Sequence, residues 1–171
     1  KAFDAVEMPL SITYRCPKSH VTLAQEIVPQ IQAFEQAKEG TIIHSFNAKD
    51  IHTVEAGSLV LCRRNAPLVP SALHCLKMGK KAVVKGKDFA KNLSSILRKF
   101  KTEDCAEAVK RLSAWEESEM IKFASKPEMQ SLIADKAEVM MIFLEDVKTV
   151  SEACKKMEDL FNDEETKAIT F

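Results

Sequence analysis

The tetrapeptide Tyr14-Arg15-Cys16-Pro17 is the segment of the sequence best suited to chemistry. It stands where an alternating apolar and polar stretch, residues 8–15, predicts a half-buried strand, and Pro17 suits the first turn of a following helix. Parallel α/β sheets place ligands at such strand-to-helix junctions. There Tyr14 can stack on a base and Arg15 can pair with a phosphate. On the local residues alone, a structural role is favoured, namely a buried tyrosine with its arginine ion-paired at the sheet edge.

Other catalytic and ligand-binding motifs are absent from the sequence. The phosphate loop G-x-x-x-x-G-K-[ST] does not occur, and Gly79-Lys80-Lys81 has the wrong neighbours. The histidines and cysteines lack regular ligand spacing, so we predict no metal site. With no base identifiable near Cys16, a packing role is favoured for its thiol. Taken alone, the chain has no complete catalytic apparatus.

Strands and helices that must position these residues alternate up to about residue 101. Apolar spacing predicts one helix from Pro17 past Ile31 to a stop at Gly40, and Asn65 is the expected N-cap of another that Gly79 ends. This alternation favours a parallel α/β layer structure. The strands are predicted at 8–15, 41–44, 58–62 and 82–84, and a third helix at 89–100.

The pattern becomes helical after residue 101. Apolar stripes at helical spacing predict helices over 109–123, 129–144 and 150–161, and we interpret the stripes as core. The last four residues, 168–171, predict a strand. The clearest boundary is therefore expected near Lys101.

Composition excludes several classes of protein. The 171 residues carry 25 basic and 25 acidic groups with 46% hydrophobic residues, which predicts a folded domain with or without an insert. No apolar run approaches the roughly 20 residues that cross a bilayer, so no membrane partner is expected. Five cysteines without a C-x-x-C pair favour reduced thiols and a cytoplasmic location. A start without Met suggests that the chain is a piece of a longer protein.

Charge is unevenly distributed along the chain. Residues 77–101 hold nine basic groups against one acid, whereas residues 102–165 hold eight basic and seventeen acidic groups. The middle segment could face a polyanion, and the later one should repel it. Solvated helix faces explain the basic segment about as well.

Four segments, in order, resemble motifs of the UvrD/Rep-type superfamily 1 DNA helicases. LSITYRCP at residues 10–17 resembles motif IV, roughly L-x-x-N-Y-R before a helix. LVLCRRNA at 59–66 resembles the family's V-L-x-R-x-N-A segment, and 78–86 resembles its next strand, which ends in glycine. AITF at 168–171 looks like the opening of motif V. The resemblance spans nearly the whole chain.

This resemblance implies a fragment of a second motor domain. The implied fold class is α/β, a partial RecA-like parallel sheet of the P-loop NTPase type layered with helices, plus an all-α helical insertion. Residues 1–101 would form part of the motor domain, 102–165 a short insertion as in compact phage-type relatives, and 166–171 the strand that returns to the motor domain. The chain would stop inside motif V and before motif VI.

The resemblance also implies roles for individual residues. In the family, ATP binds between two motor domains, and the phosphate loop and Mg²⁺ belong to the first. Tyr14 would stack on the adenine, and Arg15 would contact the γ-phosphate as a catalytic arginine finger. Arg63 and Asn65 match positions that contact the backbone of single-stranded DNA. The implied protein is an ATP-dependent helicase acting on single-stranded or partly duplex DNA, inactive without its first motor domain.

Departures from the family pattern and two rival functions remain. Thr13 stands where Asn is common, Cys62 where Tyr is common, and Pro67 where the family has a polar residue, which affects the finer DNA contacts.

One rival function is a non-catalytic interaction module that docks a partner through its acidic helices. The other is a single-strand-binding accessory protein, which predicts oligonucleotide binding by the chain itself with a marked salt dependence.

Overall fold

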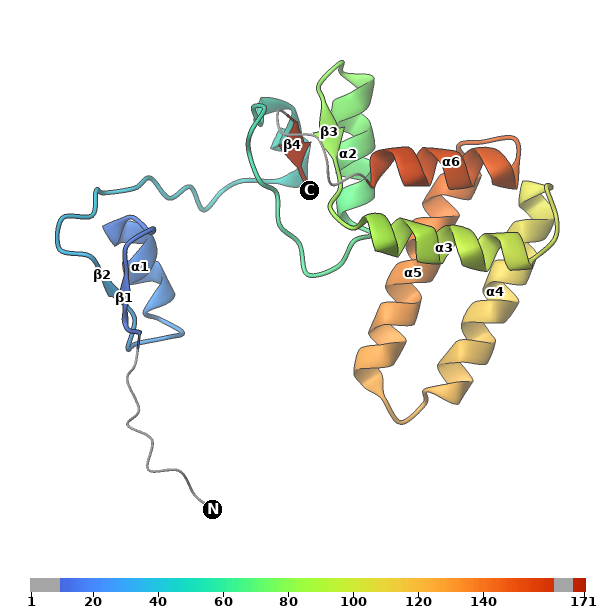
Figure 1. Cartoon of the computed structure of the whole chain (residues 1–171), viewed down its shortest axis with the longest axis horizontal. Helices are drawn as coiled ribbons and strands as arrows, with labels where there is room; N and C mark the ends of the chain where they lie inside the picture. The colour runs from blue at the N-terminus through green and yellow to red at the C-terminus, as the bar shows by residue number, and fades with distance from the viewer. Residues whose placement is uncertain (1–9, 162–167) are drawn as a thin grey trace. The chain divides into compact units, whose positions relative to one another are not determined.

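The computed structural model describes residues 10–161 and 168–171 and is mixed α/β (Figure 1). It divides into two compact units, one up to Phe46 and the other from Asn47 onward. The mixed α/β class is therefore confirmed, whereas the RecA-like architecture stays a prediction. The assignment of 1–101, 102–165 and 166–171 also stays a prediction, and parts of these ranges, 1–9 and 162–167, lie outside the described residues.

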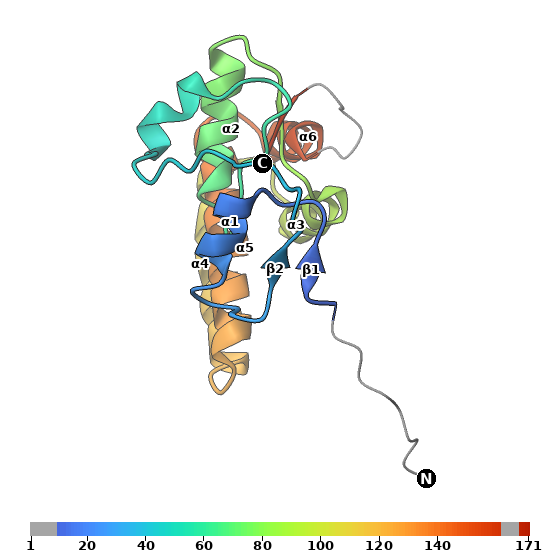
Figure 2. The same ribbon diagram turned by 90° about the vertical axis from the view of Figure 1, so that its left-hand side faces the viewer.

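The first unit contains a β-α-β arrangement of short elements. Strand β1 (Ile12–Thr13) is followed by helix α1 (Lys18–Ala24) and strand β2 (Gln32–Ala33), and the two strands pair in parallel (Figure 2). The amide of Gln32 donates to the Ser11 carbonyl over 2.7 Å, and the amide of Phe34 donates to the Thr13 carbonyl over 3.1 Å. Because the strands are parallel, the residues that follow them lie at one edge of the pair.

Two predicted elements of the first unit were wrong. The helix expected to reach Gly40 ends at Ala24, because the ring of Pro29 excludes continued helix and biases Val28 away from helical conformation. The segment 41–44 forms no strand, and its Ile43 is exposed. An apolar run that gains no partner strand and no burial has nothing to hold it extended. The strand predicted over 8–15 is confirmed only at β1, and Met8 and Pro9 lie outside the described residues.

The second unit is built on a small parallel sheet. Strand β3 (Ala82–Val83) pairs in parallel with β4 (Ile169–Thr170). On its other side β4 bridges Leu59, and the Val60 amide donates to the Thr170 carbonyl over 2.8 Å. The predicted strand at 58–62 is thus an extended segment with a single bridge. β4 therefore lies between two segments that are more than 80 residues earlier in the chain.

Six helices accompany this sheet in the described part of the second unit. α4 and α5 form an antiparallel hairpin, and α3 lies alongside α6 (Figure 1). The helices predicted after residue 101, and the one predicted at 89–100, are confirmed in type and approximate range. None of the described helices is both long and apolar enough to span a bilayer. The helices are the 3₁₀ helix η1 (Ala48–Thr53), α2 (Leu68–Lys77), α3 (Lys87–Lys99), α4 (Cys105–Lys122), α5 (Pro127–Glu145) and α6 (Val150–Leu160).

The ends of α2 illustrate one confirmed and one wrong prediction. Gly79 follows the helix with φ +75°, a conformation that glycine adopts without a Cβ penalty, so the predicted stop is confirmed. At the other end, Asn65 was expected to be the N-cap, but α2 begins at Leu68 and its N-cap position, Pro67, has no side-chain cap. The side chain of Asn65 is engaged elsewhere, as described below.

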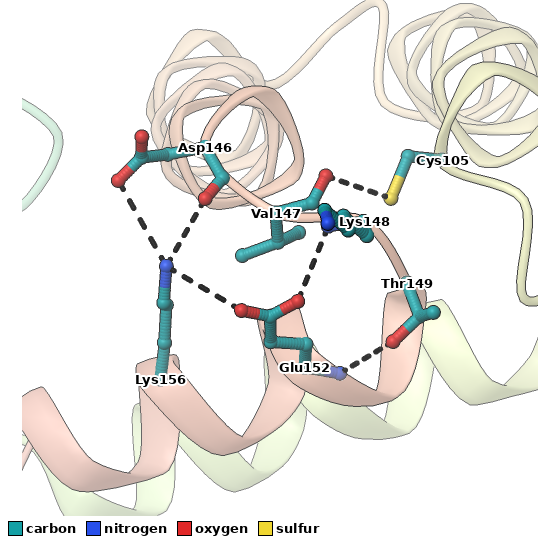
Figure 3. Close-up of polar contacts among 7 residues, drawn as sticks. All are labelled: Cys105, Asp146, Val147, Lys148, Thr149, Glu152 and Lys156. Carbon is teal, nitrogen blue, oxygen red and sulfur yellow. Dashed lines mark hydrogen bonds and ion pairs between the residues drawn. The ribbon is translucent and has the colours of Figure 1, made fainter.

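The turn between α5 and α6 is fixed by side-chain contacts (Figure 3). Thr149 caps α6 by accepting the Glu152 amide over 3.2 Å, while the Glu152 carboxylate accepts the Lys148 amide over 3.2 Å. Lys156 then reaches back from α6 and donates to the Asp146 carbonyl over 3.0 Å. These contacts satisfy backbone groups at the end of one helix and the start of the next, which sets how α6 leaves α5.

Burial predicts that two leucines of α5 contribute very differently to the free energy of unfolding. Leu144 is 2% exposed, whereas Leu132 is 42% exposed. Leu144→Ala is expected to lower the free energy of unfolding by about 2–5 kcal/mol, because it leaves a cavity that the surrounding helices cannot fill. Leu132→Ala, the matched control, should cost less than about 1 kcal/mol. Urea unfolding followed by circular dichroism measures both, and equal losses would contradict this core.

Candidate functional site

Tyr14 lies at the carboxyl edge of the β1–β2 pair. It follows β1, and Phe34 follows β2, so the parallel pairing brings the two rings together with centroids 4.9 Å apart and planes at 40°. Tyr14 is 73% exposed. A tilted aromatic pair of this kind presents π-surface to solvent while one ring supports the other. The edge can therefore accept a flat, aromatic ligand group.

Phe34 is a residue of this site that the sequence analysis missed. The long helix predicted through Ile31 hid the strand at β2, and with it the ring that supports Tyr14. Pro29 was the available signal, because a helix that stops before it leaves Ile31–Ala33 as a strand candidate. Phe34 would then fall at the same edge as Tyr14.

Arg15 directly follows Tyr14 in the sequence. It lies in the bend between β1 and α1, and its side chain is exposed. It makes no hydrogen bond or ion pair with any residue of 10–161 or 168–171. The structural alternative, a buried tyrosine beside an ion-paired arginine, does not describe these side chains. A guanidinium without an internal partner keeps its full capacity to bind a phosphate or carboxylate.

Arg63 and Asn65 belong to the second unit and lie between the extended segment at 57–60 and helix α2. Arg63 is exposed and has no hydrogen bond or ion pair with a residue of the described ranges. Asn65 is half-buried, and its Nδ2 donates to Oδ2 of Asp135 over 3.1 Å. One donor of the Asn65 side-chain amide is thus used within the protein. Arg63 is therefore better suited than Asn65 to contact a polyanion.

Asp135 is the second residue that the sequence analysis missed. It lies within the apolar stripe of α5, where only the helical spacing was considered, and it is 3% exposed. Its carboxylate accepts from the backbone amides of Asn65 and Ala66 over 3.1 Å and 2.9 Å. No short-range pattern links residues 70 positions apart, so this contact leaves no local signal.

The basic segment 77–101 is partly used within the fold. Lys80 donates to the carbonyls of His52 and Val54, where η1 ends, the latter over 2.8 Å. Arg98 pairs with Glu158 at 3.1 Å, joining α3 to α6. These cations are engaged within the fold, so the segment is not a continuous row of free positive charge.

The described residues contain no group of three or more His, Cys, Asp or Glu side chains able to hold an ion. All five cysteines are free. Comparison of the chain with protein-family models, with curated proteins and with solved structures gives no match.

Thiol reactivity should follow burial. Cys62, beside Arg63, is exposed, whereas Cys75 and Cys154 are buried. Burial raises the pKa of the Cys75 thiol, an effect that the charge of Lys80 partly offsets, and burial also raises the pKa of Cys154. At mildly alkaline pH a smaller fraction of these two buried thiols is therefore ionised to the reactive thiolate. We expect Cys62 to react with a maleimide at least about tenfold faster than either of them. Mass spectrometry of timed samples identifies the labelled cysteine, and preferential labelling of Cys75 would contradict the structure.

Proposed function

We propose that this chain is part of the second motor domain of an ATP-dependent DNA helicase or translocase. The observation that carries the proposal is the pair Tyr14 and Arg15, both exposed where parallel β1 ends. This is the position at which α/β sheets place nucleotides. The four ordered motif resemblances agree with it, and the proposed location is the cytoplasm, with which five free cysteines are compatible.

The proposed chemistry divides the work between two domains. ATP and its Mg²⁺ are held by the phosphate loop of a first motor domain. Tyr14, supported by Phe34, stacks on the adenine. Arg15 contacts the γ-phosphate, where a guanidinium stabilises the negative charge that develops as the bond to the leaving group breaks. Hydrolysis then requires both domains to close on one nucleotide.

Arg63 supplies the proposed contact with DNA. An exposed guanidinium in the turn before α2 suits the backbone phosphate of a single strand, a contact that holds the strand without reading its sequence. The amide oxygen of Asn65 stays available for a sugar hydroxyl or a base. The DNA partner is a single-stranded or partly duplex molecule.

A non-catalytic interaction module is the second candidate, and one observation favours it. The α4–α5 hairpin exposes apolar side chains, with Ile121 76% accessible to solvent. Scattered exposed apolar residues are common on protein surfaces, so they are weak support for an interaction module. Arg15 at the end of β1, which has no partner among the described residues, is stronger support for the motor function. With the interaction function, neither Arg15 nor Arg63 would affect nucleotide or DNA chemistry.

Replacing Arg15 tests the motor function. In the protein where this segment is joined to a first motor domain, Arg15→Ala should lower DNA-stimulated ATP hydrolysis about 10³-fold or more, because the transition state loses its cation. ATP binding, measured with a fluorescent analogue, should persist. Lys38→Ala removes another exposed cation of the same unit and is the control. Near-normal turnover by Arg15→Ala, or hydrolysis by the 171-residue chain alone, would contradict the proposal.

Replacing Arg63 tests the DNA contact. In the protein where this segment is joined to a first motor domain, Arg63→Ala should weaken binding of a short thymidine oligonucleotide. It should also lower the slope of log K against log salt by about 0.7, the share of one phosphate contact on a single strand. The oligonucleotide should also slow maleimide labelling of the neighbouring Cys62. Lys155→Ala, an exposed cation on α6, is the control. If both variants bind equally well, the strand does not lie on this turn.

A further inference from the structure

Asp135 is a carboxylate that the proposed function does not use. It lies near the middle of α5 and is 3% exposed. Removing a carboxylate from water is costly unless hydrogen bonds replace its hydration. Aspartate also favours helix ends and turns over helix interiors. A buried aspartate at this position therefore indicates a specific partner.

That partner is the turn which carries Arg63. Oδ2 of Asp135 accepts the backbone amide and the side-chain Nδ2 of Asn65, both at 3.1 Å, and Oδ1 accepts the amide of Ala66 at 2.9 Å. One carboxylate thus fixes two successive peptide units and one side chain. Hydrogen bonds to an ionised acceptor are stronger than neutral ones, so the turn is held firmly.

The turn also leads directly into α2. The amides of Leu68 and Val69 donate to the Asn65 carbonyl over 2.9 Å and 3.3 Å, so Asn65 joins the contact with Asp135 to the first turn of the helix. The Asp135 charge faces the amino-terminal end of α2, where the helix dipole favours an anion. Asp135 therefore joins α5 both to the residues before α2 and, through Asn65, to the first turn of that helix.

A second acidic residue of α5 contacts the same turn more weakly. Glu138 lies three residues after Asp135 and pairs with Arg64 at 3.7 Å, with about half of both side chains exposed. Exposed pairs of this kind contribute little stability. The two contacts engage Arg64 and Asn65, while Arg63 has no partner among the described residues.

We propose that Asp135 is a positioning residue that holds the Arg63–Ala66 turn in the conformation that grips a single DNA strand. Through Asp135, α5 controls the DNA contact of the turn that precedes α2. Displacement of α5 would release the Asn65 and Ala66 amides and lower the affinity for the strand. This inference rests on the proposed function, because it assumes that Arg63 binds a backbone phosphate.

The test compares two neutralised carboxylates on α5. Amide signals are recorded on the ¹⁵N-labelled 171-residue chain, and oligonucleotide binding is measured on the protein in which this segment is joined to a first motor domain. Asp135→Asn removes the acceptor charge of the turn, whereas Glu138→Gln, the control, removes the neighbouring charge and leaves the Asp135 bonds in place. Asp135→Asn should shift the Asn65 and Ala66 amide proton signals upfield and weaken binding of a short thymidine oligonucleotide about three- to tenfold, the cost of misplacing one positioned contact. Glu138→Gln should leave both nearly unchanged.

A double variant separates positioning from general destabilisation. If Asp135 acts through Arg63, then Asp135→Asn has no further effect on binding in the Arg63→Ala background, whereas effects of independent origin add. Circular dichroism and melting establish that each variant is folded. Where Asp135→Asn fails to fold, Asp135→Glu replaces it, because it keeps the charge but displaces the carboxylate by one methylene, and weaker binding is again expected.

The outcomes distinguish the two proposals. If Asp135→Asn, or Asp135→Glu in its place, shifts the amide signals while oligonucleotide affinity stays at the wild-type value, the positioning role is overturned and the DNA role of Arg63 stands. Additive losses in the double variant also overturn it. If the protein joined to its first motor domain binds no oligonucleotide, or its Arg63→Ala variant binds as well as wild type, the proposed DNA contact fails, and this inference fails with it.

Discussion

The last strand of the chain holds the second unit together. β4 is hydrogen-bonded on both sides: the Ile169 amide donates to the Lys81 carbonyl over 2.9 Å, and the Thr170 amide donates to the Ser58 carbonyl over 2.9 Å. Two segments separated by more than 20 residues are thereby fixed beside each other in parallel. Because α2 follows one of them and α3 follows the other, β4 also sets where these helices begin.

Parallel pairing explains where the candidate residues lie in both units. Tyr14 and Arg15 come directly after β1, and Arg63 comes shortly after the extended segment that pairs with β4. Residues after parallel strands gather at the carboxyl edge, where backbone groups are no longer paired within the sheet and side chains can turn to a ligand. The same rule therefore places both sets of residues, although they belong to separate units.

How much of this could be predicted depends on the range of the interactions. The helices after residue 101 were predicted because a long apolar stripe at helical spacing is a local signal. Asp135 shows the limit: its position in that stripe suggests core, and only the fold brings Asn65 within hydrogen-bond distance. Phe34 was missed for a local reason, since Pro29 ends the predicted helix early. The short strands needed partners that spacing alone does not reveal.

Several acidic groups of the helical region are engaged within the fold. Seventeen acidic groups in residues 102–165 suggested a surface that rejects DNA. Asp135 is one of them, yet it is buried and bonded to three N–H groups of Asn65 and Ala66, so it holds the turn that carries Arg63. Several others are paired with cations: Glu107 with Arg111, Glu119 with Lys122, Glu138 with Arg64, Asp146 and Glu152 with Lys156, and Glu158 with Arg98. Two of these cations, Arg64 and Arg98, come from the segments before residue 102, so the basic and acidic parts of the chain partly neutralise each other. Under the proposed function, the field that a DNA strand meets would be set by the cations that have no partner among the described residues, and Arg63 is one of them.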